Sequence, residues 1–502
     1  ATEAAPDILS AEVRHAIAHM KGGTSPGTDG ISIELLKAGG RHLHRTLASL
    51  FTSFLHGRIP DCWRTARTVL LYKKGDKEDV GNYRPISLLP VLYKLYTRIL
   101  LGRVERRLDE YQPVEQAGFR KRFSVTDHLH ALSQTIERSR EFRLPLILVF
   151  VDFAKAFDTV EHSAVLQALL DAGVEPVYVR AIEDCYTDAS TTIRLFDDEL
   201  EIPVRRGVRQ GDTISPKLFT TALQYAMKDF DWDSHGISID GRNLSNLRFA
   251  DDIVLLAKSP NEAETMANEL LKACRRIGLE MNLKKTMLMR NSWAATDPIL
   301  LDGRPLTETD CYVYLGRSIN MDGKLSEEIG RRRRAAWTAL GGIKDVTKLL
   351  RHQRKTRAYL FDSTVLPALI YGTETWACTK AAISAIASTH RALERNLLDI
   401  TRTTMLASGL HSADLRQRSG IRDVERTVED RRLRWAGHLA RRTDDRWATR
   451  TTEWTPYDHT RPRGRPPTRW LDSVVDTIKA RVHDVTPRSG AAFQTQLDAD
   501  LK

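Results

Sequence analysis

Three aspartates that follow apolar segments are the side chains of this sequence best placed to do chemistry. Asp152 ends an apolar run that begins at Ile147, and the adjacent Asp251 and Asp252 separate two further apolar runs. A carboxylate at the end of a buried strand is unfavourable unless it is paired or binds a metal ion. Asp152 and Asp251 are 251 − 152 = 99 residues apart, so their strands must pair for the carboxylates to meet at one edge of a sheet.

Each feature alone also has an ordinary structural interpretation. Asp152 can be the N-cap of a helix that begins within residues 153–157. Asp251 and Asp252 can lie in a solvent-exposed turn, although Asn-Gly or Asp-Gly is more typical of a tight hairpin. The combination favours phosphoryl transfer, because two divalent cations need such a cluster of hard oxygen ligands. One ion would activate a 3′-hydroxyl, and the other would neutralise a triphosphate and the leaving pyrophosphate.

The segments around these carboxylates predict an α+β fold. Strand-like runs at 69–72, 146–151 and 247–256 are separated by segments with helical spacing, in an order too irregular for a βαβ repeat. Two helices are expected on either side of the glycine-rich break 22–30, and another helix follows Pro90. The predicted core therefore has strands that carry the carboxylates and helices that cover them.

Composition limits the class of partner. The chain has 502 residues with 76 Lys and Arg against 65 Asp and Glu, a formal charge of +11, which indicates a polyanionic partner only weakly. The five cysteines form no CxxC pair, which favours isolated reduced thiols. No apolar run approaches the roughly 20 residues of a membrane span, so no membrane partner is expected.

Three motifs, in this order and at these spacings, resemble those of reverse transcriptases. Residues 151–158, Val-Asp-Phe-Ala-Lys-Ala-Phe-Asp, look like the first catalytic motif, and residues 249–252, Phe-Ala-Asp-Asp, look like the second. Between them, residues 206–216 are similar to the glycine-rich motif that faces template and nucleotide. The motifs resemble those of non-LTR (LINE-type) retrotransposons, and tail patterns at 434–438 and 464–470 suggest the RTE-like group.

This resemblance implies a right-hand polymerase with fingers, a palm that contains an antiparallel sheet, a helical thumb and a basic C-terminal region. The expected divisions are 1–50 for an N-terminal extension, 51–319 for fingers and palm, 320–400 for the thumb and 401–502 for the C-terminal region. From 401 to 470 the sequence has 16 Arg, nine acidic residues and no Lys. The C-terminal region is therefore expected to bind RNA or target DNA through phosphates.

The resemblance also implies the catalytic roles. Asp152 and Asp251 are expected to hold two Mg²⁺ ions, with Mn²⁺ as an alternative. Asp252 would assist them, and the main-chain carbonyl of Phe153 would add a ligand. Lys285 resembles the lysine near the leaving pyrophosphate and is a candidate general acid.

Nucleotide-binding residues are implied in the same way. Arg84 and either Lys73 or Lys74 resemble the pair that clamps the triphosphate, and a guanidinium suits bidentate contact with phosphate. Phe157 matches the bulky residue under the sugar, which repels a ribose 2′-hydroxyl and so selects dNTPs. A core aromatic is the ordinary alternative for Phe157.

Further residues are implied to contact nucleotide, template or primer. They are Gln210, Gly211, Gly118, Phe119, Arg120, Tyr314, Leu315 and Gly316. The first two belong to the glycine-rich motif and face nucleotide and template. The next three belong to a fingers motif that faces the template, and the last three form a turn that grips the primer end.

The expected partners are an RNA template, a DNA primer or target, and dNTPs, in target-primed reverse transcription of a retroelement. Such elements carry an endonuclease that nicks the target, and this sequence has neither its motif nor a starting Met. The endonuclease is therefore expected on a missing N-terminal part of the same polyprotein. The site of action is expected in the nucleus after synthesis in the cytoplasm, although no targeting signal is identified.

Three alternatives remain at this point. A catalytically inactive descendant would serve as an RNA- and DNA-binding scaffold, but it would be free to lose its carboxylates, and all three are present. A nucleotide cyclase on a related palm needs neither a template motif nor a thumb. A group II intron-type enzyme is disfavoured by the motif around Asp152 and by the tail.

Overall fold

The structure is a computed structural model that describes residues 5–73, 75–195, 198–464 and 467–485. Helices of the first half are α1 (Ser10–Ala18), α2 (Ile33–Ala38), α3 (Arg41–His56), α4 (Val91–Tyr111), α5 (Val125–Phe142), α6 (Ala156–Thr159), α7 (His162–Asp171), α8 (Pro176–Tyr186), α9 (Ser215–Met227) and α10 (Pro260–Arg276). Helices of the second half are α11 (Ser326–Leu349), α12 (Arg354–Leu360), α13 (Leu366–Leu369), α14 (Lys380–Leu397), α15 (Arg402–Ala407), α16 (Ser412–Ser419), α17 (Val424–Ala440), α18 (Trp447–Glu453) and α19 (Trp470–Val485). None of the helices in these ranges has the length and apolar character needed to cross a membrane.

The strands are β1 (Thr65–Tyr72), β2 (Tyr83–Leu88), β3 (Ile147–Val151), β4 (Ser190–Leu195), β5 (Asp198–Pro203), β6 (Ile237–Ile239), β7 (Arg242–Leu244), β8 (Asn246–Phe249), β9 (Asp252–Ala257), β10 (Met287–Arg290), β11 (Leu300–Leu301), β12 (Arg304–Pro305), β13 (Thr307–Glu308), β14 (Tyr312–Tyr314) and β15 (Arg317–Ile319). Among the described residues, one sheet has the order β13-β10-β3-β9-β8 and another the order β2-β1-β4-β5. Most neighbouring strands are antiparallel, and helices contain far more residues than strands do. The expected α+β fold is confirmed.

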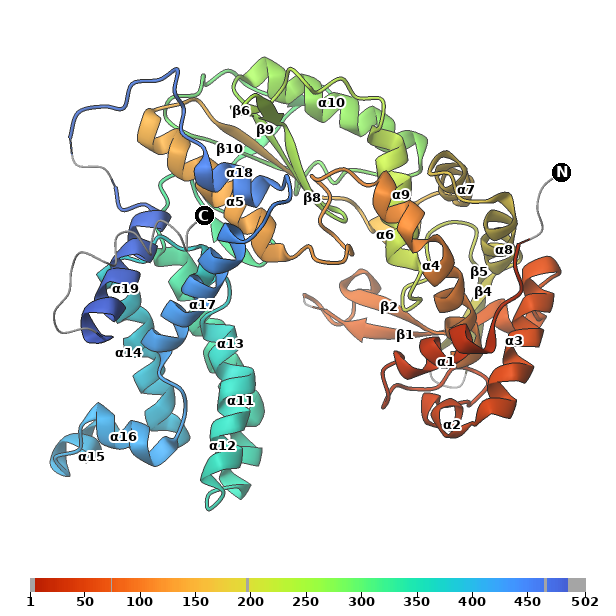
Figure 1. Cartoon of the computed structure of the whole chain (residues 1–502), viewed down its shortest axis with the longest axis horizontal. Helices are drawn as coiled ribbons and strands as arrows, with labels where there is room; N and C mark the ends of the chain where they lie inside the picture. Colours follow the sequence, from red (N-terminus) through yellow and green to blue (C-terminus); the bar gives the residue numbers. More distant parts are fainter. Residues whose placement is uncertain (1–4, 74, 196–197, 465–466, 486–502) are drawn as a thin grey trace.

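The first of these sheets separates two hydrophobic cores. Because β3 alternates its side chains between two faces, Ile147, Val149 and Val151 join a core with α9 and α10. Leu148 and Phe150 join a second core with α5. All five residues are buried, which explains why this segment reads as a continuous apolar run. Figure 1 shows α10 and α5 on the two sides of the sheet.

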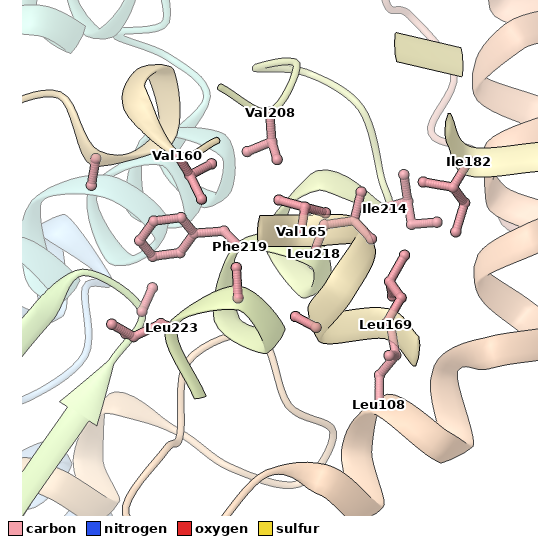
Figure 2. Close-up of a cluster of buried hydrophobic side chains, with 14 of the residues drawn as sticks. Leu108, Val160, Val165, Leu169, Ile182, Val208, Ile214, Leu218, Phe219 and Leu223 are labelled. Atoms are coloured by element: carbon pink, nitrogen blue, oxygen red, sulfur yellow. The ribbon is translucent and has the colours of Figure 1, made fainter. Parts of the chain in front are cut away.

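Helices α4, α7, α8 and α9 pack together beside this sheet (Figure 2). Two residues of the glycine-rich segment 206–216, Val208 and Ile214, are buried among them and lie close to Leu218 and Leu169 in the close-up. This segment is therefore tied to the core at two points, and of the residues between them Gly211 is exposed. That arrangement positions part of the candidate site.

The second half of the chain is helical and returns to the sheet. Helices α11, α13 and α14 share a core with the first half of α17, which includes Val424 and Val428. The second half of α17 packs against α18 and α19 through Trp435, Leu439 and Trp470. Helix α18 in turn packs on α5, beside the sheet (Figure 1). The limits of the four divisions expected from the sequence stay predictions.

Candidate active site

The adjacent aspartates lie at a tight hairpin between β8 and β9. Phe249 pairs with Asp252, so Ala250 and Asp251 form the turn between them. Ala250 has φ 57°, a left-handed conformation that is uncommon for a residue with a side chain. The predicted turn is confirmed, and its strained backbone requires support from outside the hairpin.

That support comes from Gln116, which begins the segment 116–120 that resembles a fingers motif facing the template and was given no part in holding the hairpin. The side-chain Oε1 of this fully buried Gln116 accepts hydrogen bonds from the main-chain N–H of Ala250 (3.0 Å) and of Gly118 (2.8 Å). A Cβ at Gly118 would lie 2.4 Å from the nitrogen of Ala250, so only glycine allows this approach. Residues 116–118 therefore brace the turn that carries Asp251. Their position directly before Phe119 in the fingers motif was the available signal.

Asp152 lies at the end of β3, beside the hairpin. Val151 pairs with Ile253, which brings Asp152 opposite Asp252 at the edge of the sheet. The N–H of Asp152 donates to Thr286 Oγ1 (3.3 Å), and its carbonyl accepts from the N–H of Asn282 (2.7 Å). The strands pair as the sequence predicted.

The alternative role of Asp152 as a helix N-cap is wrong. Helix α6 begins at Ala156, and its N-cap is Lys155, with φ 53°. Four residues, 152–155, thus separate the end of β3 from the helix. Asp152 has no capping role, and its side chain belongs to the sheet edge.

The three carboxylates converge less closely than the sequence suggested. Asp251 lies in the turn and Asp252 begins β9, and adjacent residues of an extended chain project in different directions. In the part of the chain that the structure describes, no group of three or more His, Cys, Asp or Glu side chains is arranged to hold a metal ion. Asp152 and Asp251 are the better pair of candidate ligands, and Asp252 is more exposed.

The electrostatics of the site indicate an excess of negative charge. Burial raises the pKa of Asp152, although the charges of Lys285 and Lys73 oppose the shift. Burial also raises the pKa of Asp251, and repulsion from Asp152 adds to the effect. The pKa of Asp252 is raised to about 6, first by the protein atoms packed around its carboxyl and then by repulsion from Asp251 and Asp152. A bound cation would reverse these shifts, because it favours the ionised carboxylates.

Cations of the protein face this charge from two directions. Lys285 Nζ lies 3.9 Å from Asp152 Oδ2. Lys73 and Arg84 lie on the β1–β2 hairpin, where Leu71 pairs with Arg84 and the N–H of Lys73 donates to the carbonyl of Asn82 (2.9 Å). The charge of Lys73 acts on both Asp152 and Asp251, and that of Arg84 acts on Asp251. Lys74 lies outside the described residues.

Phe157 has features of both of its interpretations. Its ring stacks on that of Phe219, with centroids 4.4 Å apart and planes at 19°, and half of the residue is covered by the core. The ring of Phe119 meets it edge-on, with centroids 6.3 Å apart. Phe119 is 46% exposed and has φ 58°. Phe157 is thus held between a core aromatic and an exposed aromatic of the fingers motif.

Phe153, which follows Asp152, and the glycine-rich segment complete this side of the site. Phe153 is buried and forms an isolated antiparallel bridge with Met281. The carbonyl of Gln210 accepts from the N–H of Ser87 on β2 (3.2 Å). Gly211 has φ 108°, and a Cβ there would lie 2.9 Å from the carbonyl oxygen of Ser87. The glycine lets this segment lie directly against the strand that carries Arg84.

The β14–β15 turn is held by the helical second half of the chain. Tyr314 is buried in the core, and its hydroxyl donates to the carbonyl of Leu247 (3.5 Å). The carbonyl of Leu315 accepts from the hydroxyl of Tyr371 (2.8 Å), and that of Gly316 accepts from Arg332 (2.9 Å). Tyr314 therefore serves the core, and contact of this turn with a primer stays a prediction.

Arg120 has a structural role in this conformation. Its guanidinium donates to the carbonyls of Pro113 (2.6 Å), Gln116 (3.1 Å) and Asp109 (3.1 Å) at the end of α4. It also lies over the ring of Phe123, 4.4 Å from the centroid. The expected contact of Arg120 with template stays a prediction.

Arginines of the C-terminal region contact the protein itself. Arg442 forms an ion pair with Asp127 of α5, and Arg461 and Arg469 lie 3.4 Å and 3.8 Å from Glu141 at the other end of that helix. The pairs formed within the region or with the adjoining helices involve Arg416, Arg422, Arg431, Arg446, Arg450 and Arg481. Nucleic-acid binding by this region, inferred from its composition, stays a prediction.

Much of this sequence is similar to that of known proteins. The reverse transcriptase (RNA-dependent DNA polymerase) family matches residues 72–319. A transposon-derived protein of Caenorhabditis elegans is 47% identical over 262 residues, which cover 51% of this chain and 93% of that protein. A Pol polyprotein from a type-1 retrotransposable element of Popillia japonica is 31% identical over 318 residues, 60% of this chain and 43% of the polyprotein. A 115 kDa protein in a type-1 retrotransposable element of Drosophila melanogaster is 28% identical over 418 residues, 80% of this chain and 40% of that protein. The chain thus spans about two fifths of the length of the last two.

Proposed function

The chain belongs to the reverse transcriptases of non-LTR retrotransposable elements, and from that membership we propose that it extends a DNA 3′-hydroxyl with dNTPs on an RNA template by a two-metal mechanism. Enzymes of this family are RNA-directed DNA polymerases. The observation that carries the proposal is the meeting of Asp152 and the Asp251 hairpin at one sheet edge, opposite the cations of the β1–β2 hairpin. Carboxylates on one side and cations on the other suit a nucleoside triphosphate with its metal ions.

The donor set fits divalent cations in its chemistry. Asp152 and Asp251, with the main-chain carbonyl of Phe153, would hold two Mg²⁺ ions, or Mn²⁺ as an alternative, and Asp252 would assist. Hard oxygen ligands suit these ions. The pKa of all three carboxyls is raised by burial first, and at Asp251 and Asp252 also by repulsion from neighbouring carboxylates, and a bound cation would offset both effects. When bound, the ions acidify the attacking 3′-hydroxyl and neutralise charge on the phosphates.

The remaining roles fall to side chains of the chain. Arg84 and Lys73 bind the triphosphate, since both lie on the hairpin that faces the carboxylates. Lys285 lies close enough to Asp152 to donate a proton to the leaving pyrophosphate at the same site. Phe157, held against Phe219, would meet the sugar of the incoming nucleotide and exclude a 2′-hydroxyl.

Incorporation of dNTPs on a primed RNA template with Mg²⁺ tests this proposal. The parent chain should incorporate dNTPs, and Asp152→Asn and Asp251→Asn should each lower incorporation about a thousandfold. Asp240→Asn is the matched control, because Asp240 is exposed in the turn between β6 and β7, where Asn tolerates the observed φ of 47°. No incorporation by any form, with RNA binding retained, would favour an inactive scaffold. Equal incorporation by all forms would refute the carboxylate assignment.

The wider setting of the reaction is also part of the proposal. We propose target-primed reverse transcription, in which a nicked DNA target supplies the 3′-hydroxyl, because relatives belong to type-1 retrotransposable elements. An endonuclease on another part of the same polyprotein, a nuclear site of action and membership of the RTE-like group stay predictions. Detection of complementary DNA of the element joined covalently to the 3′ end of a nicked target would test whether the target supplies the 3′-hydroxyl.

A further inference from the structure

Asp158 contacts a residue of the nucleotide site although no role was assigned to it. It directly follows Phe157, and its Oδ1 accepts a hydrogen bond from Gln210 Nε2 at 2.6 Å. The two residues are 52 positions apart in sequence and both are half-buried. Burial raises the pKa of Asp158, while the hydrogen bond from Gln210 and the charge of Lys155 oppose the shift. The contact thus joins the first catalytic motif to the glycine-rich motif.

The main chains of these two motifs are also joined. The N–H of Val208 donates to the carbonyl of Phe157, and the N–H of Gly207 donates to the carbonyl of Val160, both at 2.7 Å. The carbonyl of Gly207 lies 2.9 Å from His162 Nε2. Gly207 has φ 86°, and a Cβ there would lie 2.6 Å from the main chain of Asp158. The motifs therefore form one unit in which Phe157 and Gln210 keep a fixed relation.

Residues on both sides of Gln210 are fixed to other elements. Arg209 is buried and donates to the carbonyls of Trp63 and Arg64, each at 3.0 Å. Asp212 is buried and accepts from Thr97 Oγ1 at 2.7 Å. Val208 and Ile214 lie in the helical core beyond them (Figure 2). The backbone at Gln210 is therefore fixed, and the orientation of its carboxamide depends on Asp158.

We propose that Asp158 is a positioning residue that fixes the rotation of the Gln210 carboxamide toward the incoming nucleotide. A carboxylate only accepts hydrogen bonds, so the amide must turn its NH₂ group to Asp158. Oε1 of Gln210 then faces away from Asp158, toward the incoming nucleotide, and can accept a hydrogen bond from it. The inference rests on the proposed polymerase function, and it adds that Gln210 acts as an acceptor because Asp158 orients it.

Two donors on a nucleotide fit this acceptor: a hydroxyl of the sugar and an exocyclic amino group of the base. Thymine has no exocyclic amino group, and dideoxynucleotides have no sugar 3′-hydroxyl. A variant that loses the acceptor should therefore affect dATP but not dTTP if the donor is the base. It should affect dTTP but not its dideoxy analogue if the donor is the sugar.

Insertion kinetics of single nucleotides on a primed RNA template test the proposal. Asp158→Ala and Gln210→Ala should each raise the KM for dNTP about tenfold, the upper end for one hydrogen bond between neutral groups, with kcat nearly unchanged. The double variant should be no worse than either single variant, because both remove the same contact. Asp158→Asn should retain most of the parent KM, since its side-chain carbonyl can still accept. Primer–template Kd and Tm should stay at parental values.

Other results would overturn the inference. Fully additive effects of the two alanine substitutions would show that the side chains act independently. Parallel losses in Tm, primer–template binding and kcat for Asp158→Ala would show a merely structural role. An active parent with either outcome refutes this inference alone, whereas a parent that incorporates no dNTP refutes the proposed function and this inference together.

Discussion

The carboxylate site and the C-terminal region both concentrate charge of one sign, but the protein neutralises that charge very differently. At the site, Asp251 and Asp252 keep raised pKa values, and Lys285 approaches Asp152 only to 3.9 Å. In the C-terminal region, arginines such as Arg442 are paired with carboxylates of α5 or of neighbouring helices. Charge that the fold leaves uncompensated is available to a ligand, whereas paired charge supports the fold.

From composition alone, the C-terminal region rather than the carboxylate site looked like the place that binds a ligand. Sixteen Arg within residues 401–470 suggested a surface for nucleic acid, while three aspartates among apolar residues were individually ambiguous. The structure shows the contacts that composition omits. Several arginines of this region are paired with carboxylates of the protein, so its composition alone does not establish nucleic-acid binding.

The largest expected effect is a loss of activity without a loss of stability at the carboxylate site. Asp251→Asn should lower kcat for dNTP incorporation about a thousandfold, because a metal ligand is lost. Its Tm should stay at or above the parental value, since the substitution relieves repulsion with Asp152 and Asp252. Incorporation assays and thermal unfolding measure the two quantities. A clear fall in Tm would mean that the carboxylate is structurally compensated, contrary to the comparison.

The opposite pattern is expected for Arg442→Ala. It removes the ion-pair partner of the buried Asp127, which keeps Arg446 at 4.0 Å and two hydrogen bonds from Ser124. The free energy of unfolding should therefore fall by about 3 kcal/mol, the lower end for loss of one partner of a buried pair. Urea unfolding should show this loss, and the Kd for RNA should hardly change. Arg441→Ala, one residue away and exposed, is the matched control and should do little to stability. Weaker RNA binding with unchanged stability would restore the interpretation drawn from composition.

A smaller effect depends on pH at the junction of α5 with the C-terminal region. Burial raises the pKa of Glu137 from 4.5 to about 7, and its carboxyl accepts from the N–H of Trp470 (2.8 Å). A raised folded-state pKa stabilises the protein fully below pH about 4.5, and this contribution is lost as pH rises toward 7. As pH rises from about 4.5 to about 7, the cost of ionising the buried Glu137 carboxyl should lower the free energy of unfolding by about 3 kcal/mol. Glu137→Gln should lack this part of the pH dependence in urea unfolding, and identical profiles would contradict the assignment.

The smallest effect concerns cations that the protein leaves exposed. Arg351 and Lys355 lie at the exposed end of the α11–α12 pair. Replacing both with Ala should reduce the slope of log Kd for primer–template against log salt by about two, if each contacts a phosphate. Lys258→Ala with Lys272→Ala, exposed near α10, removes the same charge elsewhere. Equal changes in slope for the two pairs would show that only net charge matters.

The sequence predicted what local pattern determines. The continuous apolar run before Asp152 predicted β3, and the aspartate pair between apolar runs predicted the β8–β9 turn. Helix α4 follows Pro90 as expected, although it extends to Tyr111. Contacts between residues far apart were not predictable in this way. The brace at Gln116 and the Asp158–Gln210 contact depend on how the chain folds back, and no local periodicity records that.

The partners of long charged side chains were the least predictable feature. Arg120 and Arg442 have the same residue type and a similar neighbourhood of basic residues in sequence. The Arg120 guanidinium contacts main-chain carbonyls at and just after the end of α4, and the Arg442 guanidinium contacts a buried aspartate of α5. A flexible side chain with several donors can reach many acceptors, so tertiary packing decides which one it meets.

Two of the contacts that join the helical second half of the chain to the first half lie on different elements. One is the β14–β15 turn, whose carbonyls accept from Tyr371 and Arg332. The other is α5, against which α18 and the start of α19 pack. Any displacement of these helices relative to the first half must therefore strain or break contacts at the turn expected to meet the growing primer.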